Sequence, residues 1–295
     1  LNRETEQLSA LSGRASYTET EKGITVKANG RTFVFSKKDG QLKDVSVNNR
    51  KISFANGPRF IGARRADRSL DQFYNHDDEK AKAKDRTYSE FTDAAVFTKL
   101  DVKEEGGNLI LTANYKLGNL DKAQWTIHPD GMATLDYTYN FSGVVDLMGI
   151  CFDYPEEQVL SKRWLGAGPY RVWQNRIHGT QYDIWENDYN DPIPGETFTY
   201  PEFKGYFGSV SWMSIRTKEG TISLTNETPD SYIGVYQPRD GRDRLLYTLP
   251  ESGISVLNVI PPVRNKVNST DLCGPSSQPK WVDGSQTGRL VIRFE

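Results

Sequence analysis

The sequence predicts a mostly-β protein that forms one large antiparallel domain, and three observations point to this fold class. Short segments rich in Val, Ile, Thr, Tyr and Phe recur along the chain, and these residue types suit a pleated, half-buried surface. Asn-Gly and Asp-Gly pairs separate several of the segments, as they do in β-hairpins. Helical signals are sparse: residues 77–86 contain alanine but no apolar stripe, so we expect a short exposed helix or a loop there.

The first predicted strands flank two turns. Residues 24–28 and 31–36 are separated by Asn29-Gly30, and Asp39-Gly40 precedes residues 42–47. Alternation of apolar and polar residues around an Asn-Gly pair is the strongest short-range hairpin signal. The same criteria predict further strands at 108–116, 123–128, 132–141, 144–152, 208–217, 221–225, 232–237, 253–260 and 289–294.

Length and charge limit the organisation and the partners. The 295 residues are enough for one large β domain with a sizeable core. We expect residues 1–22 to be a linker or a peripheral strand and residues 23–295 to be a single domain. The 37 basic and 39 acidic residues give a net charge of -2, which argues against nucleic acid as a partner. No apolar run approaches the 18 residues that would span a bilayer, so no membrane partner is expected.

No cofactor or metal motif stands out. Gly166-Ala167-Gly168 is followed by Pro169 and lacks the third glycine of a dinucleotide loop. Cys151 and Cys273 have no metal-ligand spacing, and two buried thiols are favoured over a disulfide. Four acidic residues are expected to be a solvated surface rather than a calcium site: Asp183, Glu186, Asp188 and Asp191.

Two long segments, 56–92 and 166–207, show no strand alternation, and long loops in compact domains are usually functional or disordered. The second segment is rich in Trp, Tyr, Pro and Gly, which argues against disorder. It begins within the run Trp-Leu-Gly-Ala-Gly-Pro-Tyr-Arg-Val-Trp-Gln-Asn-Arg, residues 164–176. Trp and Tyr offer flat apolar faces with a polar handle, and a sugar ring presents C–H patches together with hydroxyls. The segment therefore indicates either a sugar-binding surface or loops that pack onto a sheet.

The run 164–176 resembles the Trp-x-Gly-x-Gly-Pro motif of the C-terminal domain of β-galactosidases, which belong to glycoside hydrolase family 2. Tyr200-Pro201-Glu202-x-x-Gly205 is similar to a later Tyr-x-x-Pro-Gln-Glu-x-Gly stretch of that family. A looser match places residues 56–60 and 65–67 at the family's Arg-Ala-Pro-Thr-Asp-Asn-Asp loop. The resemblance covers residues 23–294.

This resemblance implies a large antiparallel β-supersandwich of the galactose mutarotase type. It also implies an accessory, carbohydrate-binding domain of a glycoside hydrolase acting on plant or host glycans, with both catalytic carboxylates on a separate (β/α)8 barrel of the parent enzyme. Nothing in the sequence has the alternating pattern of that barrel. The chain begins at Leu1 without a signal peptide, so we expect a processed protein or a piece of a longer enzyme, in the periplasm or secreted.

We expect the carbohydrate-facing groups to be Trp173, Arg176, Tyr182, Trp185 and Glu202, with the aromatic rings stacking and the charged groups bonding hydroxyls. No catalytic residue, cofactor or metal is assigned, and the isolated domain is expected to be inactive. The family often sends a Trp into the sugar pocket from a C-terminal Gly-Gly-Asp-Ser-Trp-like loop. The corresponding residues 269–275 keep an Asp but lack the Trp, and Trp281 is the candidate substitute.

Three alternatives stay open. A free-standing sugar epimerase needs a His acid and a carboxylate base, and the histidines are His76, His128 and His178. A polysaccharide lyase would hold uronate carboxylates with basic side chains (Arg171, Arg176, Lys204) and use Tyr182 or Tyr206 as base. A non-catalytic interaction module would need neither arrangement.

Overall fold

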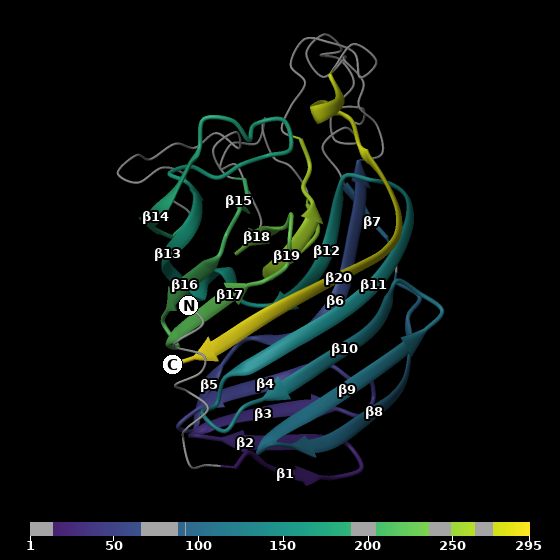
Figure 1. Ribbon diagram of the computed structural model, residues 1–295, viewed down its shortest axis with the longest axis vertical. Helices are drawn as coiled ribbons and strands as arrows, with labels where there is room; N and C mark the ends of the chain where they lie inside the picture. Colours follow the sequence, from purple (N-terminus) through teal and green to yellow (C-terminus); the bar gives the residue numbers. More distant parts are fainter. Residues whose placement is uncertain (1–13, 66–87, 92, 190–204, 236–248, 263–273) are drawn as a thin grey trace.

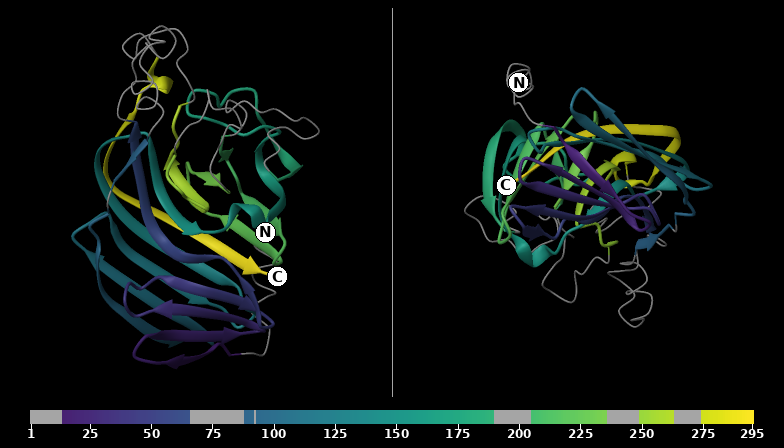
Figure 2. Two further views of the ribbon diagram at one scale, coloured as in Figure 1. Left: turned by 180° about the vertical axis from the view of Figure 1, so that it is seen from behind. Right: turned by 90° about the horizontal axis from the view of Figure 1, so that it is seen from below.

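The computed structural model describes residues 14–65, 88–91, 93–189, 205–235, 249–262 and 274–295, and two large antiparallel sheets pack face to face in it (Figures 1 and 2). One sheet has eleven strands in the order β1-β2-β3-β4-β6-β12-β19-β18-β15, with β5 beside β4 and β7 beside β6. The other has nine strands in the order β14-β13-β16-β17-β20-β11-β10-β9-β8. The predicted all-β supersandwich is thereby confirmed.

The eleven-stranded sheet consists of β1 (Ser16–Glu19), β2 (Gly23–Ala28), β3 (Arg31–Ser36), β4 (Leu42–Val47), β5 (Arg50–Ile52), β6 (Ala55–Arg65), β7 (Tyr88–Glu90), β12 (Leu147–Asp153), β15 (Phe207–Gly208), β18 (Tyr232–Gly234) and β19 (Ile254–Val259). The nine-stranded sheet consists of β8 (Val96–Glu105), β9 (Asn108–Lys116), β10 (Leu120–Ile127), β11 (Ala133–Val145), β13 (Val159–Gly168), β14 (Gln181–Asp188), β16 (Trp212–Thr217), β17 (Thr221–Asn226) and β20 (Lys280–Phe294). Two short 3-10 turns, η2 (Glu156–Gln158) and η5 (Pro275–Ser277), are the helical elements among the described residues.

The predicted Asn-Gly hairpin forms between β2 and β3. Ala28 pairs with Arg31, so Asn29 and Gly30 are the two turn residues. Their φ angles are 42° and 74°, the left-handed values that a tight two-residue hairpin turn needs and that Asn and Gly tolerate best. The predicted bounds of β3, β4 and β9 are also confirmed.

Two segments predicted to lack strands do contain them, so that interpretation was wrong for β6 and β14. Along β6, Phe60 packs between the sheets while Ile61 and Ala63 are buried on the opposite face. A strand buried on both faces shows no alternation. Among the described residues β14 is an edge strand that pairs with β13 alone and is mostly exposed, so its composition resembles that of a loop. β8 and β13 were not predicted either.

Several strand boundaries in the structure also differ from the predicted ones. The break between β11 and β12 falls at Asp146, four residues after the predicted one at residue 142. The predicted strand 208–217 is divided into β15 and β16, and β20 begins at Lys280, nine residues before the predicted start at Arg289. In the N-terminal segment, Ser16–Glu19 is a peripheral strand paired with β2.

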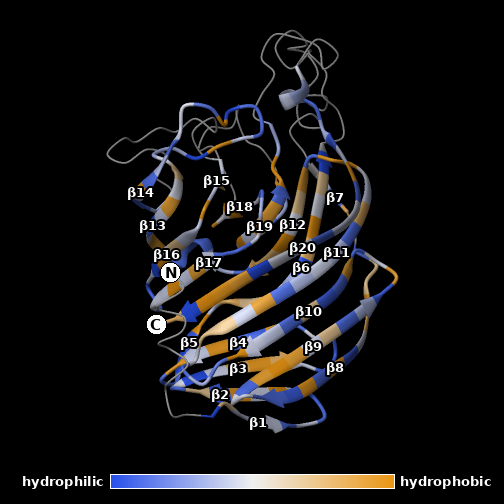
Figure 3. Ribbon diagram, viewed as in Figure 1, coloured by the Kyte–Doolittle hydropathy of each residue, from blue (hydrophilic) through white to orange (hydrophobic). Residues whose placement is uncertain are grey.

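The main core lies between the two sheets. In Figure 3 apolar and polar residues alternate along strands such as β9, whose residues alternate between buried and partly exposed. Trp125 of β10 packs edge-to-face on Phe35 of β3 at 5.9 Å between ring centres, and Phe54 stacks on Phe152 at 4.5 Å. Rings from both sheets thus interdigitate, which fixes the packing of one sheet on the other.

A second core covers the opposite face of the eleven-stranded sheet. Ile61, Cys151 and Leu257 project from β6, β12 and β19, and Trp173 and Tyr206 pack over them. Cys151 is a free, buried thiol, as predicted, and burial raises its pKa to about 12. Cys273 lies outside the described residues. The outer face of this sheet is therefore where the aromatic segment attaches.

Candidate functional site

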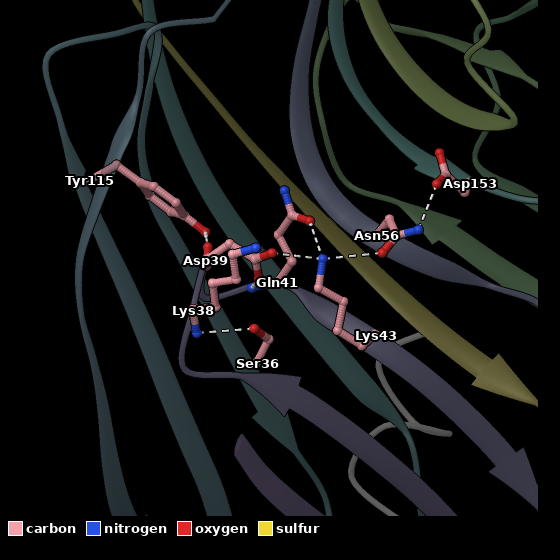
Figure 4. A network of polar contacts seen from close by, with 8 residues as sticks. All are labelled: Ser36, Lys38, Asp39, Gln41, Lys43, Asn56, Tyr115 and Asp153. Carbon is pink, nitrogen blue, oxygen red and sulfur yellow. Dashed lines mark hydrogen bonds and ion pairs between the residues drawn. The ribbon is translucent and has the colours of Figure 1, made fainter. Parts of the chain in front are cut away.

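A chain of polar contacts runs from the β3–β4 turn across the neighbouring strands β4, β6 and β12 of the eleven-stranded sheet (Figure 4). Lys43 of β4 donates to the side-chain oxygens of Gln41 and Asn56, at 2.8 and 3.1 Å, and its ammonium lies 2.8 Å from a carboxylate oxygen of Asp39. Burial raises the pKa of Asp39, but hydrogen bonds from Lys43 and from the Gln41 amide outweigh this, so the pKa lies below its usual value. Asp39 is therefore ionised at neutral pH.

Asn56 and Arg59 extend this chain to Asp153 at the end of β12. Asn56 has a φ of 52°, a left-handed conformation that Asn adopts more readily than most residues, and its amide donates to Asp153 at 2.7 Å. Arg59 of β6 donates to the other oxygen of Asp153 at 2.9 Å and to the Glu251 carbonyl at 3.1 Å. Together with Asp39, Gln41 and Lys43 these three residues are here called the polar network.

Two hollows flank the polar network. The first, here called the carboxylate hollow, has a volume of about 510 Å³ and is lined by Asn56, Asp153 and Glu251 with carboxylates of the η2 turn. The second, here called the ring hollow, has a volume of about 570 Å³ and is lined by Asp39, Gln41 and Arg59, together with aromatic rings from β6, β8 and β9. Both volumes fall in the range of small-molecule sites in proteins.

The aromatic segment predicted from the sequence is tied to distant parts of the chain by its backbone. Val172 and Tyr206 exchange two backbone hydrogen bonds, at 2.7 and 2.8 Å. The side-chain amide nitrogen of Gln174 donates to the carbonyls of Ser276 and Gln278 at 2.9 and 2.6 Å. Its Oε1 accepts no hydrogen bond from the described residues. The motif thus holds the region before β20 against the outer face of the eleven-stranded sheet.

Trp173 and Arg176 lie together but face different surroundings. Each donates a backbone N–H to the other's carbonyl, at 3.4 and 2.9 Å. Trp173 is 1% exposed and packs edge-to-face on Tyr206 at 5.7 Å, so its ring offers no face to a ligand in this structure. Arg176 is exposed at the surface.

Tyr182 and Trp185 both lie on the edge strand β14, on opposite faces because they are three residues apart. Tyr182 is 59% exposed, and its hydroxyl lies 2.6 Å from that of Ser211. Trp185 is half-buried, opposite Trp164 of β13, and its indole fills the space beside Gly168, where a Cβ would come within 2.4 Å of the ring. Glu202 lies outside the described residues. Among the described residues, neither of the two hollows beside the polar network is lined by Trp173, Arg176, Tyr182 or Trp185.

The remaining candidates from the sequence are placed as follows. Arg171 is buried, and its guanidinium carbon lies 5.9 Å from the centre of the Phe207 ring, while Tyr206 is 1% exposed. Both positions favour packing over the uronate binding and base roles of a lyase. Trp281 is 69% exposed on β20. Residues of 77–86, His76, Asp191, Lys204 and the loop 269–273 lie outside the described residues.

Sequence reasoning missed the polar network and both hollows. Within the described ranges no group of three His, Cys, Asp or Glu side chains is placed to hold a metal ion, and no helix is long and apolar enough to cross a membrane. The missed residues come from several strands and carry no local motif apart from Asn56-Gly57-Pro58-Arg59, the run that carries the looser family match.

His128 gives a testable pH dependence. Its Nε2 lies 2.9 Å from the Thr134 hydroxyl, and burial lowers its pKa from the ordinary 6.5. The folded state therefore disfavours the protonated ring. The contribution of the neutral His128 ring to the unfolding free energy is therefore complete above pH 6.5. It is lost as the pH falls below 6.5 and through the lower pKa of the folded state. We expect the unfolding free energy of the wild type to drop more between pH 7.5 and 5.5 than that of His128→Gln, measured by urea denaturation. Equal drops would contradict the assignment.

The two stacked antiparallel sheets define a class, the galactose mutarotase-like sandwich. A galactose 1-epimerase from Lactobacillus acidophilus NCFM is similar in structure, with a TM-score of 0.51 at 9% identity, covering 96% of this chain and 99% of that one. A galactose mutarotase-like protein from Lactobacillus casei ATCC 334 is less similar, with a TM-score of 0.41 at 10% identity, covering 95% of this chain and 100% of that one. A putative aldose 1-epimerase from Escherichia coli K12 has a TM-score of 0.40 at 12% identity, covering 95% of this chain and 99% of that one. At these identities the likeness shows the fold alone.

The family follows from the sequence itself. Residues 27–258 match the family model described as beta galactosidase small chain, and the chain belongs to that family. The predicted family resemblance is thereby confirmed. No curated protein matches the sequence closely enough to count as a relative.

Proposed function

We propose that this chain is the accessory domain of a β-galactosidase-like glycoside hydrolase and supports a carbohydrate site together with a larger chain that carries the catalytic carboxylates. The observation that carries the proposal is the family match over residues 27–258. Hydrolysis of a glycosidic bond needs one carboxyl group that donates a proton and a second that acts as nucleophile or base. On this proposal both belong to the barrel of the partner.

The carboxylates of the polar network suit a supporting role. Asp153 accepts hydrogen bonds from Asn56 and Arg59 on its two oxygens. Asp39 is paired with Lys43, and its pKa lies below the usual value. A general acid at neutral pH needs a raised pKa, so Asp39 is a poor proton donor. The network positions strands and side chains rather than reacting.

The histidines argue against the epimerase alternative. An epimerase site needs a His and a carboxylate that face one pocket. His128 is partnered by Thr134, His178 is exposed, and neither hollow beside the polar network is lined by a histidine among the described residues. These positions favour the accessory role over proton transfer at a sugar's anomeric centre.

On this proposal the carbohydrate contacts of the aromatic segment come from exposed groups. Tyr182 stacks on a sugar ring at the edge strand β14, and Arg176 donates to hydroxyls, while Trp185 holds β14 against β13 beside Gly168. Glu202 stays a predicted contact. Trp173 supports the segment from the second core.

The experiment is reconstitution. We expect the chain alone to leave nitrophenyl β-galactoside uncleaved, and co-expression with the proposed barrel-bearing partner chain to give hydrolysis that requires both parts. As a control, the chain alone is mixed with fresh α-galactose and optical rotation is followed. Hydrolysis by the isolated chain, faster mutarotation than in buffer, or full activity of the barrel without this chain would each refute the proposal.

A further inference from the structure

The ring hollow is separate from the aromatic segment and has the composition of a small-ligand site. It opens where the β3–β4 turn meets β6, β7, β8 and β9, and its volume is about 570 Å³. None of its lining residues belongs to the segment 164–206. Aromatic rings line one part of it, and charged and amide side chains from the β3–β4 turn, β6, β7 and the segment before β8 line the rest.

The rings of the hollow are fixed before any ligand arrives. Phe97 and Tyr115 meet edge-to-face at 5.9 Å, and the Tyr115 hydroxyl donates to the Asp39 carbonyl at 2.8 Å. Phe91 stacks on Phe141 at 5.7 Å between ring centres. Of the four lining rings, Phe60 is buried, whereas Phe91, Phe97 and Tyr115 pack against the core and stay partly exposed. Such rings bind a flat apolar face with little loss of conformational entropy.

Three polar side chains on the rim have unused hydrogen-bonding capacity. Within the described part of the chain, neither the Lys38 ammonium nor the Glu90 carboxylate has a hydrogen bond or an ion pair. Gln41 accepts from Lys43 through its Oε1, and in Figure 4 its amide nitrogen points away from Lys43. The rim therefore offers donors from Lys38 and Gln41 and acceptors from Glu90.

The charges around the hollow favour a neutral ligand. Arg59 is engaged by Asp153, and Asp39 by Lys43. Asp93 accepts from the backbone N–H groups of Ala95 and Asn119. Those amides are neutral, so the groups left over are the Lys38 ammonium and the carboxylates of Glu90 and Asp93. This balance disfavours an anionic ligand such as a uronate.

We propose that the ring hollow binds a pyranose unit of a neutral saccharide, with its C–H face on Phe97 and Tyr115 and its hydroxyls bonded to Lys38, Gln41 and Glu90. The arrangement matches both surfaces of such a ring, one apolar and one rich in donors and acceptors. This site adds to the contacts proposed at Tyr182 and Arg176, and it does not depend on the larger chain.

The test is calorimetric titration of the full chain with methyl β-galactopyranoside, methyl β-glucopyranoside and galacturonate, with saturation-transfer NMR to identify the bound face. We expect at least one neutral pyranoside to bind more tightly than galacturonate. Loss of ring stacking in Phe97→Leu raises Kd by about tenfold, and Glu90→Gln and Lys38→Ala, both at exposed positions, also weaken binding. Tyr17→Leu, at an exposed ring of β1 that does not line the hollow, is the matched control and leaves this Kd unchanged.

Three results would overturn the proposal: no binding of either neutral pyranoside, tighter binding of galacturonate, or a Kd that none of the three hollow variants changes. Circular dichroism verifies the fold of Phe97→Leu. If that variant does not fold, the Kd values of Glu90→Gln and Lys38→Ala test the proposal. These outcomes are independent of the reconstitution experiment, because galactosidase activity with the barrel does not require a sugar in the ring hollow.

Discussion

Replacing Trp173 by alanine is expected to destabilise the protein by about 3–5 kcal/mol, the usual loss when a buried Trp or Phe is truncated. The indole is 1% exposed and belongs to the second core, where it packs on Tyr206. Its removal leaves a cavity between the aromatic segment and the outer face of the eleven-stranded sheet. Urea denaturation followed by far-UV circular dichroism measures the change, because that signal does not depend on the deleted indole.

Tyr182→Ala is the matched control for Trp173→Ala. Tyr182 is 59% exposed and makes one hydroxyl contact, to Ser211, so we expect a loss below about 1 kcal/mol. Equal losses of unfolding free energy in Trp173→Ala and Tyr182→Ala would mean that the indole is not part of a core. The sequence-based interpretation of Trp173 as a surface that stacks on a sugar would then be favoured.

This pair of residues illustrates what the sequence could and could not predict about the site. Composition drew attention to the segment 164–206, and the motif resemblance of residues 164–176 pointed to the family that the family model confirms. It could not distinguish Trp173 from Tyr182, because a loop has no periodicity that reports which side chains face the sheet. That assignment depends on the bridge between Val172 and Tyr206, two residues far apart in the chain.

The fold was predictable where one face of a strand is buried and the other is not. The bounds of β3 and β9 followed from their alternation. β6 was missed because its alternate residues enter two different cores, as Phe60 and Ile61 show. The ring hollow was beyond prediction for a related reason: Gln41, Glu90 and Tyr115 are ordinary residues of separate elements, and only the packing of the two sheets brings them together.

The attachment of the aromatic segment makes a second large effect predictable, at Gly205. A Cβ built on Gly205 would lie 2.0 Å from the Val172 carbonyl oxygen and 3.1 Å from the Trp173 ring. The backbone oxygen cannot retreat without breaking the paired hydrogen bonds between Val172 and Tyr206, at 2.7 and 2.8 Å. We therefore expect Gly205→Ala to cost about 3 kcal/mol, the upper end of the usual penalty for overpacking a core.

Gly274→Ala provides the control for Gly205→Ala. Gly274 has a φ of -62°, and nothing lies within 4 Å of a Cβ built there. Alanine at such a position is expected to be neutral or to stabilise the fold by about 0.5 kcal/mol, because it restricts the unfolded chain. Hydrogen exchange adds a local measurement: in Gly205→Ala the amides of Val172 and Tyr206 should exchange faster than those of β9. Unchanged protection at these two amides, together with equal stabilities of the two alanine variants, would contradict the prediction. Gly205 would then not be needed for the close contact between the segments of Val172 and Tyr206.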